Sequence, residues 1–404
     1  ARAMGRLSQA LKDKGHKSQM LVGRSKKSDD PDIHLIWDEV KQYRNLPDSL
    51  KSRIGNQIEK YVGIHPWANR LNLRISDTEL FEWADLIDLR NLFGGFFNLW
   101  SLPSITSGKP VVWRLPDLWA ITGHCAYPYD CERWITGCYK CPLLTREGRK
   151  IVEPPPTIWD GSKRIWRAKR EIYQEAPLHV VVTTKWMQQQ VSRSILAGAL
   201  SINVISNGVN LDIFHPIDKT QARSQLGLPT DEKVLLWAGH RKGAYRKGFR
   251  LANKAMEIVQ EKDPKQAMFI TMGESKRWKE PERLKNFKHF GFIEDSYKQA
   301  LVYAAADVFL CTTLADGQPQ TALESMACGT PVIAFDIGPM PEEVIEAKTG
   351  FIVPDQNPHA LVSVIEKFLK NEELGPGLQA NCRKQAQDKY DLDKQSNEYI
   401  DLYE

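Results

Sequence analysis

Two acidic side chains frame a loop and the start of a helix in the last third of the chain. Asp316 and Glu324 are separated by seven residues, and the glycine and proline between them predict a loop. Thr321 is the expected N-cap of a helix over residues 322–328. Free N–H groups at a helix N-terminus carry partial positive charge and favour anionic ligands. We therefore predict a site for an anionic, hydroxyl-rich ligand whose hydroxyl groups donate to the two carboxylates.

A basic loop over residues 239–248 is the second candidate element. It includes Arg241 and Lys247, and it follows an apolar run at 234–238 that reads as a buried strand. Arginine grips phosphate oxygens with two N–H groups, whereas lysine acts as a point charge. A solvated surface loop is the alternative interpretation. Because the acidic pair follows in the same half of the chain, we favour a phosphate-binding loop.

His124 lies in an aromatic-rich segment, residues 117–160, which has too many bulky residues for a disordered linker. It follows an apolar run at 111–115, so it should stand at the carboxyl end of a strand. An imidazole that titrates near neutral pH can hydrogen-bond a substrate hydroxyl or carry a proton, and Asp117 could orient it. We predict an active-site role for His124. A packed histidine and a metal ligand are the alternatives.

Four of the seven cysteines fall within the same segment, with five, six and two residues between them. The last two form a chelating Cys-x2-Cys pair, and four thiolates in tetrahedral array would make a closed structural zinc site. Free buried thiols or a disulfide are the alternatives, and His124 could replace one thiol in a set of one histidine and three cysteines. The four residues are Cys125, Cys131, Cys138 and Cys141.

Apolar strand-like runs alternate with helical patterns in both halves of the chain, which predicts an α/β fold with two parallel, doubly wound sheets. We expect ligands at the carboxyl ends of the strands, in a cleft between two domains. The predicted domains are residues 1–215, containing the cysteine-rich insertion at 117–160, and residues 216–384. Residues 385–404 are the remaining C-terminal segment.

Composition sets the class of protein. A chain of 404 residues suits two domains, and contents of 42% hydrophobic and 26% charged residues are typical of a soluble globular protein. The net charge of +5 fits attraction to nucleoside diphosphates or to an anionic membrane surface, and it is too weak to indicate nucleic acid. A basic helical pattern at 163–173 is interpreted as a solvated face, with lipid contact as the alternative.

The cysteine count and the start of the chain bear on its compartment. An odd number of cysteines without a visible signal peptide predicts a reducing, cytoplasmic compartment. Ala1 falls inside a helical pattern, so we expect the natural start upstream.

The run from Asp316 to Phe335, ending Cys-Gly-Thr-Pro-Val-Ile-Ala-Phe, resembles the E-x7-E region of retaining GT-B glycosyltransferases, in particular glycosyltransferase family 4. Glu324 matches the second acid of that motif, and Asp316 stands where glutamate is commoner. The resemblance covers nearly the whole chain and implies two Rossmann-like domains facing a central cleft. It also implies that residues 385–404 are a C-terminal helical segment that crosses back to the first domain. The family's first strand and Gly-Gly loop, which approaches the donor diphosphate, have no counterpart in this sequence.

The resemblance also implies a role for each matching residue. Arg241 and Lys247 would hold the donor phosphates, with Arg246 or Lys242 as substitutes, and His124 would lie near the donor sugar. Asp316 would orient the sugar, and Glu324 would accept from the ribose hydroxyls. The remaining implied donor-site residues are Gly317, Gln318, Pro319, Gln320, Thr321 and, beside the base, Phe292.

The implied activity is a retaining, metal-independent hexosyl transfer from a UDP- or GDP-sugar to a glycan or lipid-linked acceptor, in polysaccharide or glycoconjugate biosynthesis. No cofactor would be needed for the chemistry, and the protein would be cytoplasmic, with peripheral contact at the inner membrane face. A nucleotide-sugar epimerase on the same fold and a non-catalytic nucleotide-sugar-binding partner remain alternatives. A dinucleotide oxidoreductase is disfavoured because no G-x-G-x-x-G follows a predicted strand.

Overall fold

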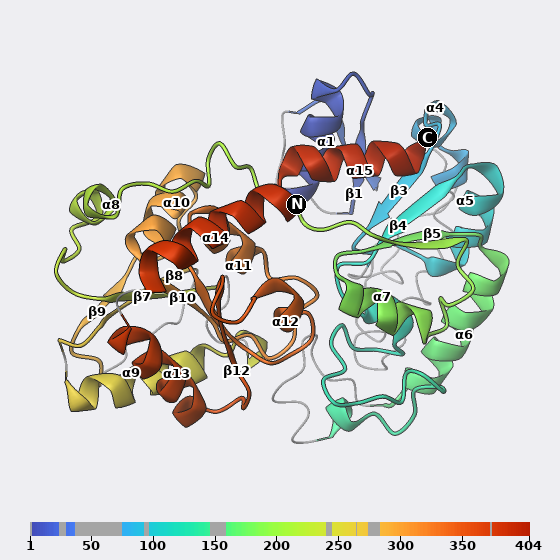
Figure 1. Ribbon diagram of the computed structural model, residues 1–404. Helices are drawn as coiled ribbons and strands as arrows, with labels where there is room; N and C mark the ends of the chain where they lie inside the picture. The colour runs from blue at the N-terminus through green and yellow to red at the C-terminus, as the bar shows by residue number, and fades with distance from the viewer. Residues whose placement is uncertain are drawn as a thin grey trace, which may run out of the picture. The chain divides into compact units, whose positions relative to one another are not determined.

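The structure is a computed structural model that describes residues 2–23, 30–36, 75–92, 97–145, 159–239, 245–263, 265–273, 283–371 and 374–404. The chain forms two compact units (Figure 1). Unit 1 comprises Ala1–Ile205 together with Ser396–Glu404, and unit 2 comprises Ser206–Gln395. The sequence analysis places these boundaries at 216 and 385. Within the described ranges, none of the helices has both the length and the apolar character needed to cross a bilayer.

Unit 1 is built on a four-stranded parallel sheet with the order β3-β4-β5-β6. A separate two-stranded parallel sheet joins β1 to β2. Valine-rich sequences such as HVVV in β5 make buried strands because branched side chains pack well on a pleated surface. The strands are β1 (Met20–Val22), β2 (Ile33–Leu35), β3 (Ile87–Arg90), β4 (Val111–Arg114), β5 (His179–Val182) and β6 (Ser201–Val204).

The helices of unit 1 come from both ends of the chain. The C-terminal helix α15 returns to this unit, where Tyr399 is fully buried against Leu7, Val112 and Val181. The principal helices are α1 (Arg2–Asp13), α4 (Glu79–Trp83), α5 (Leu102–Gly108), α6 (Ser162–Glu175), α7 (Lys185–Ser192) and α15 (Leu392–Tyr403).

Unit 2 carries a six-stranded parallel sheet with the order β12-β11-β10-β7-β8-β9. Helices cover the sheet on both faces: α9 packs with α13, while α10 packs with α8 and α11 with α14 (Figure 1). This burial explains why the strands read as continuous apolar runs. The strands are β7 (Val234–Ala238), β8 (Met268–Met272), β9 (Phe287–His289), β10 (Val308–Cys311), β11 (Val332–Phe335) and β12 (Gly350–Val353).

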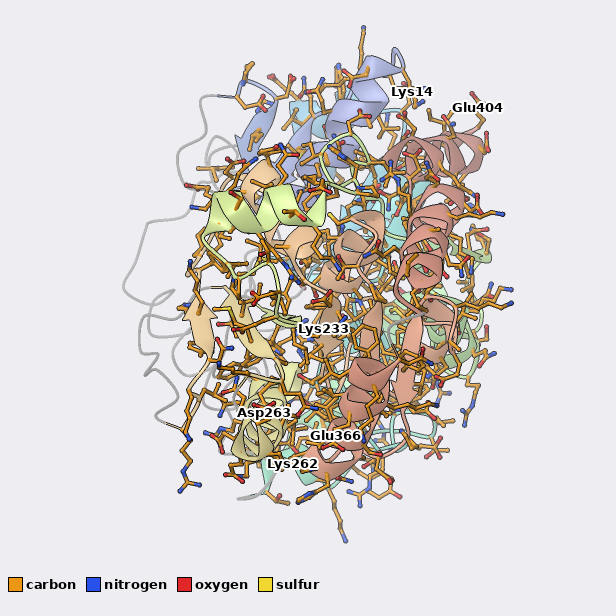
Figure 2. The ribbon with its side chains drawn as sticks, turned by 60° about the vertical axis from the view of Figure 1, so that its left-hand side comes forward. Lys14, Lys233, Lys262, Asp263, Glu366 and Glu404 are labelled. Carbon is orange, nitrogen blue, oxygen red and sulfur yellow. The ribbon has the colours of Figure 1, made fainter. Side chains whose placement is uncertain are left out.

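An ion pair on the surface of unit 2 links two of its helices. Lys262 of α9 pairs with Glu366 of α13, and Figure 2 labels both residues. This pair lies outside the sequence-predicted donor-site elements and therefore provides a control position for substitutions. The helices of the unit are α8 (Lys219–Leu226), α9 (Phe249–Lys262), α10 (Ser296–Ala305), α11 (Gln320–Ala327), α12 (Met340–Glu343), α13 (Pro358–Lys370) and α14 (Leu374–Lys389).

The strand order of unit 2 places a topological switch point between β7 and β10. From β7 the chain proceeds to β8 and β9 on one side, whereas β10, β11 and β12 follow on the other. In open α/β sheets, the loops that leave two such strands diverge and open a crevice at the carboxyl edge, where ligands bind. We therefore expect a ligand site at the loops that follow β7 and β10.

The predicted α/β class is confirmed. The sequence pattern predicts strands at 234–238 and 332–335 and a helix at 249–262, and β7, β11 and α9 have these bounds. The elements that were not predicted include β2, β12, α8 and the first half of α14. The helix α8 carries standard end signals, since Asp218 caps its N-terminus and Gly227 ends it in the left-handed conformation. The predicted helix at 51–61 lies outside the described residues.

Candidate functional site

The loops after β7 and β10 of unit 2 approach each other closely. Gly248, which precedes α9, has φ of 64°, and a Cβ atom there would stand 1.8 Å from the carbonyl oxygen of Thr312. Glycine is required at this position because any other residue would be strained in the left-handed conformation and would clash with the backbone of the neighbouring loop. The contact brings Arg246 and Lys247 beside the residues that follow β10.

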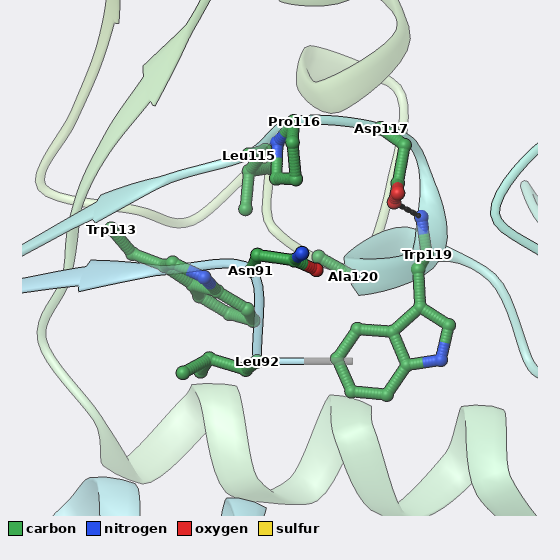
Figure 3. A pocket seen from close by; sticks show the side chains of 8 residues that line it. All are labelled: Asn91, Leu92, Trp113, Leu115, Pro116, Asp117, Trp119 and Ala120. Carbon is green, nitrogen blue, oxygen red and sulfur yellow. Dashed lines mark hydrogen bonds between the residues drawn. The ribbon is translucent and has the colours of Figure 1, made fainter. Parts of the chain in front are cut away.

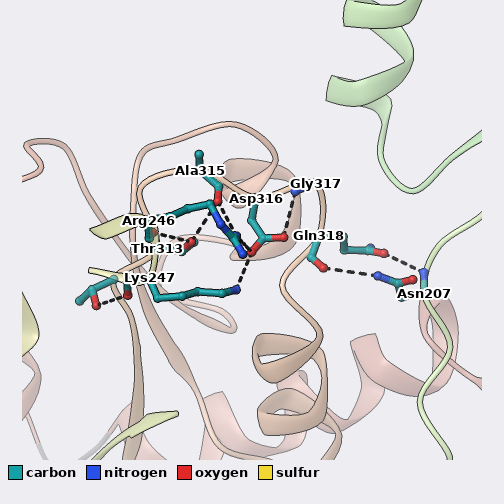
Figure 4. A network of polar contacts seen from close by, with 9 residues as sticks. Asn207, Arg246, Lys247, Thr313, Ala315, Asp316, Gly317 and Gln318 are labelled. Atoms are coloured by element: carbon teal, nitrogen blue, oxygen red, sulfur yellow. Dashed lines mark hydrogen bonds and ion pairs between the residues drawn. The ribbon is translucent and has the colours of Figure 1, made fainter. Parts of the chain in front are cut away.

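Asp316 is the centre of a charged network at this place (Figure 4). Its Oδ2 accepts from Lys247 Nζ at 2.7 Å and from Arg246 NH1 at 2.8 Å. Its Oδ1 accepts from the backbone N–H of Gly317 at 3.0 Å. Arg246 also donates to the carbonyl of Ala315 at 2.9 Å, so it holds the loop in place as well as pairing with the carboxylate. The structure therefore brings together two predicted site residues, Asp316 and Lys247, from elements distant in sequence.

The protonation of Asp316 is set by opposing effects. Burial alone would raise the pKa of this carboxyl, but the charges of Lys247 and Arg246 and their hydrogen bonds lower it below the ordinary value. Only 11% of the Asp316 side chain is exposed, against 25% for Lys247. Asp316 is thus an anion at neutral pH, beside a lysine that is accessible to a ligand.

Gln318 anchors the loop to the interior of unit 2. Its Oε1 accepts from the backbone N–H of Asn207 at 2.7 Å (Figure 4). Its Nε2 donates to Glu343 at 2.9 Å. Gln318 is 5% exposed, and burial raises the pKa of Glu343 despite the hydrogen bonds from Tyr390 and Gln318. Because the Gln318 side chain is bound to Asn207 and Glu343, the backbone of this loop is the part that can face a ligand.

The helix after this loop begins earlier than predicted. Pro319 is the N-cap of α11, without a side-chain cap hydrogen bond, so the prediction of Thr321 as N-cap is wrong. The proline fixes φ near its helical value, and its carbonyl accepts from Ala322 and Leu323, which starts the helix two residues sooner. Gln320 instead donates its side chain to the carbonyl of Gly208 at 3.1 Å.

Glu324 lies on α11 and is 8% exposed. Its Oε2 accepts from the hydroxyl of Tyr303 at 3.2 Å, a partner on α10 that the sequence analysis did not identify. Phe292 follows the left-handed Gly291 and is 50% exposed, and its contact with a base stays a prediction. Arg241 and Lys242 lie outside the described residues, so their predicted phosphate contacts remain predictions.

In unit 1, His124 is buried, at 8% exposure, in the predicted aromatic-rich segment. The predicted orienting residue Asp117 instead accepts from the backbone N–H of Trp119 at 2.9 Å. The carboxylate that interacts with His124 is Asp160, whose pKa is raised by burial but lowered on balance by hydrogen bonds from Ser162 and Cys141 and by the charge of His124. The sequence analysis missed this partner because Asp160 lies far from His124 in the sequence, after the segment that carries the cysteines.

A buried lysine holds the segment before His124. Lys169 of α6 is fully buried and donates to the carbonyls of Trp119 at 2.5 Å and Thr122 at 2.9 Å. Burial lowers its pKa to about 7, although nearby Cys138, Cys125 and Asp117 oppose the shift. The sequence analysis interpreted this helix as a solvated basic face and therefore missed the role of Lys169.

A small pocket opens at the carboxyl edge of the unit 1 sheet (Figure 3). Its walls come from the residues that follow β3 and β4, and two tryptophan rings and one amide dominate them. The pocket is far smaller than the several hundred Å³ that small-molecule sites usually have, so we assign it no ligand. The lining residues are Asn91, Leu92, Trp113, Leu115, Pro116, Asp117, Trp119 and Ala120.

The four predicted zinc ligands are all free thiols in unit 1. Cys125 is buried, and the thiols of Cys131, Cys138 and Cys141 all act on it electrostatically, which places them in one neighbourhood. Among the described residues, no three histidine, cysteine or acidic side chains already stand in an arrangement that would enclose a metal ion. The zinc site therefore stays a prediction.

Residues 218–389 match the family model described as glycosyl transferases group 1. A D-inositol 3-phosphate glycosyltransferase of Mycobacteroides abscessus is 28% identical over 217 residues, which cover 51% of this chain and 47% of that protein. The chain thus spans about half the length of this curated relative. A putative colanic acid biosynthesis glycosyl transferase, WcaC of Escherichia coli, is 23% identical over 302 residues, covering 73% of this chain and 68% of that protein.

Solved structures share the fold. A sucrose-phosphate synthase from Thermosynechococcus elongatus superposes with a TM-score of 0.67 at 20% identity, covering 99% of this chain and 91% of that one. HepE of Anabaena, solved in complex with UDP-glucose, gives a TM-score of 0.57 at 17% identity, covering 96% of this chain and 99% of that one. These likenesses show that the fold is that of the GT-B glycosyltransferases.

Proposed function

We propose that the protein transfers a sugar from a nucleoside diphosphate sugar to a hydroxyl group of a glycan or lipid-linked acceptor, because residues 218–389 match the family model described as glycosyl transferases group 1. The observation that carries the proposal is the Asp316–Lys247–Arg246 cluster at the switch point of the unit 2 sheet. The relatives named for glycosyl transfer support it.

The cluster suits the charge that develops during transfer. When the bond between the anomeric carbon and the diphosphate oxygen breaks, the diphosphate keeps the electron pair and needs cationic partners. Lys247 can supply one positive charge directly, while Arg246 holds the loop through Ala315. Asp316 and the backbone of residues 317–320 would accept from and donate to the sugar hydroxyls. Arg241, by resemblance, would add a bidentate phosphate contact.

We assign the finer features of the reaction as part of the same proposal. The donor is first sought among UDP-sugars, because HepE was solved with UDP-glucose, with GDP-sugars as the second choice. Transfer retains the anomeric configuration and proceeds without an added divalent cation. His124 serves the donor sugar from unit 1, and Glu324 and Phe292 serve the ribose and the base. The acceptor contacts unit 1, the predicted acceptor-binding domain.

The test is calorimetric titration of UDP, GDP, ADP and NAD into the wild type and Lys247→Met. We expect one nucleoside diphosphate to bind and its affinity to fall about tenfold or more in the variant, because a charged contact to phosphate contributes about 1.5–3 kcal/mol. Lys262→Met is the matched control, since its ammonium pairs with Glu366 on the surface. Binding of NAD alone, or of none of the four, would overturn the proposal.

Turnover separates the alternatives that share this fold. With the sugar conjugate of the diphosphate that binds, a transferase releases the nucleoside diphosphate only when an acceptor is present. An epimerase changes the sugar without an acceptor, and a non-catalytic binding protein changes nothing. The anomeric configuration of the product, read by NMR coupling constants, tests retention. Activity in the absence of added Mg²⁺ or Mn²⁺ tests metal independence.

A further inference from the structure

The four clustered cysteines of unit 1 are not used by the proposed function. Residues 125–141 contain no helix or strand, yet the segment is held in place: Trp134 is 3% exposed, and its carbonyl accepts from Trp166 Nε1 of α6 at 2.7 Å. Gly123 packs so tightly that an added Cβ would stand 2.2 Å from the Ser162 carbonyl oxygen. An irregular segment of this length that is nevertheless ordered usually has an additional constraint.

A backbone N–H group is directed at one of the sulfur atoms. Gly123 donates its N–H to Cys138 Sγ at 3.2 Å. The thiolate is the form that binds metal, and a hydrogen bond donated to sulfur stabilises that charged form. The Gly123 N–H therefore suits Cys138 as a metal ligand.

A fully buried cation lies next to this cluster. Among the described residues, the ammonium of Lys169 is in no ion pair, and its hydrogen bonds go to the carbonyls of Trp119 and Thr122. Its electrostatic neighbours are the thiols of Cys138 and Cys125 and the carboxylate of Asp117. A buried cation is unfavourable without compensating negative charge. A zinc ion with four thiolates has a net negative formal charge, which would add to the negative charge of Asp117 beside this ammonium.

We propose that Cys125, Cys131, Cys138 and Cys141 bind one zinc ion as a structural site with four thiolate ligands. Because no three of these thiols, all within the described part of the chain, already enclose an ion, binding requires some of them to turn inwards. A change between staggered χ1 rotamers moves a cysteine sulfur by roughly 3 Å, which is the kind of movement this binding would use. The four thiols lose their protons to solvent as the ion binds.

In this assignment the zinc ion would stabilise the irregular segment. The ion would join both ends of the irregular segment, from Cys125 to Cys141, and close it against α6. His124 is left out of the ligand set, since its charged neighbour is Asp160. It lies immediately before the first ligand, so the ion would also fix the position of the histidine. The proposal does not depend on the sugar-transfer activity, and metal content is measured without any substrate.

The experiment is metal analysis of the purified full chain by mass spectrometry after dialysis. We expect about one zinc per chain, the stoichiometry of a closed four-ligand site, and loss of that zinc in the double variant Cys138→Ser/Cys141→Ser. Cys328→Ala is the control, because Cys328 is a buried thiol of unit 2 outside the cluster, and it should keep its zinc. Zinc retained in full by the double variant would contradict the assignment.

A second measurement covers the case in which the double variant does not fold. Wild-type protein stripped of metal under reducing conditions is titrated with Co²⁺, which reports tetrahedral thiolate ligation through intense charge-transfer and d–d absorption bands. Bands that saturate at about one Co²⁺ per chain, and that Zn²⁺ displaces, support the site. Absence of these bands, or a Cys138–Cys141 disulfide in the freshly purified protein, would overturn it.

Discussion

At the scale of single residues, the site of unit 2 consists of one acidic and two basic side chains that are already paired with one another. Asp316 accepts from both Lys247 and Arg246, so a bound diphosphate would compete with this carboxylate for Lys247. Arg246 is held additionally by the Ala315 carbonyl and is less free to change partner. We therefore expect Lys247 to make the mobile phosphate contact and Arg246 to remain with the loop.

The charge of Asp316 predicts a pH-dependent difference in the free energy of unfolding between the wild type and the Asp316→Asn variant. Its folded-state pKa lies below the ordinary 3.8, so its contribution to stability is fully present above that pH and is lost as the pH falls through the folded-state pKa. Asp316→Asn should lower the free energy of unfolding by roughly 2 kcal/mol at pH 7, because two cations lose their partner. Urea titrations across the acid range should show the gap to the wild type closing only below about pH 4. A gap that is independent of pH would contradict this assignment.

At the scale of elements, the site depends on how tightly the loop before α9 meets the loop after β10. Thr312 Oγ1 donates to the carbonyl of Gly248 at 3.0 Å, and Leu314 donates its N–H to the carbonyl of Arg246 at 2.7 Å. These contacts to the backbone, rather than the charged side chains, fix the distance between the two loops. The ion pairs of Asp316 form because the loops are already adjacent.

Gly248→Ala tests this contact. The left-handed φ of 64° costs a non-glycine residue about 1–2 kcal/mol, and the added Cβ would meet the Thr312 carbonyl oxygen at 1.8 Å. We expect a total loss of about 3 kcal/mol or more, measured by urea unfolding, together with weaker nucleotide binding. Gly198→Ala is the matched control, because its Cβ would have no neighbour within 4 Å and should change stability by less than about 0.5 kcal/mol. Equal effects of the two substitutions would rule out the close contact as the cause.

At the scale of the whole molecule, the first unit is completed by the last residues of the chain. Tyr399 of α15 is buried in a cluster with Leu7 of α1 and Val112 of β4. The guanidinium of Arg90 lies 4.6 Å from its ring centroid, and Tyr403 donates to Asp88 at 2.6 Å. Residues 315 positions apart in sequence therefore share one core.

Tyr399→Ala should destabilise unit 1 selectively. Truncating a buried aromatic side chain to alanine costs about 3–5 kcal/mol, and this one packs in a cluster with residues of β4 and β5 of the unit 1 sheet. Amide hydrogen exchange read by mass spectrometry should show lost protection in β4 and β5, with the strands of unit 2 unchanged. The exposed Asp401→Ala on the same helix is the control and should leave both sheets protected. Equal loss of protection in β7 and β10 would show that the two units do not unfold separately.

Local sequence patterns were sufficient to predict the fold class and much of the candidate site. Buried parallel strands must be apolar along their whole length, so β7 and β11 were visible as apolar runs with the correct bounds. The spacing of Asp316 and Glu324 across a loop and a helix start also follows from local chain geometry. Short or mixed elements such as β12 and the glycine- and proline-containing start of α14 were missed, because neighbouring elements stabilise them against weak local preference.

Which groups face one another became visible only in the packed chain. The 2.7 Å contact of Lys247 with Asp316 joins residues 69 positions apart, and the Gln318 contact with Asn207 joins residues 111 apart. Asp160 beside His124 likewise depends on packing. Local sequence fixes hydrogen bonds within a few residues and the periodicity of burial. The partners of a charge depend on which loops the sheet brings to one edge, and that is set by strand order and packing across the whole unit.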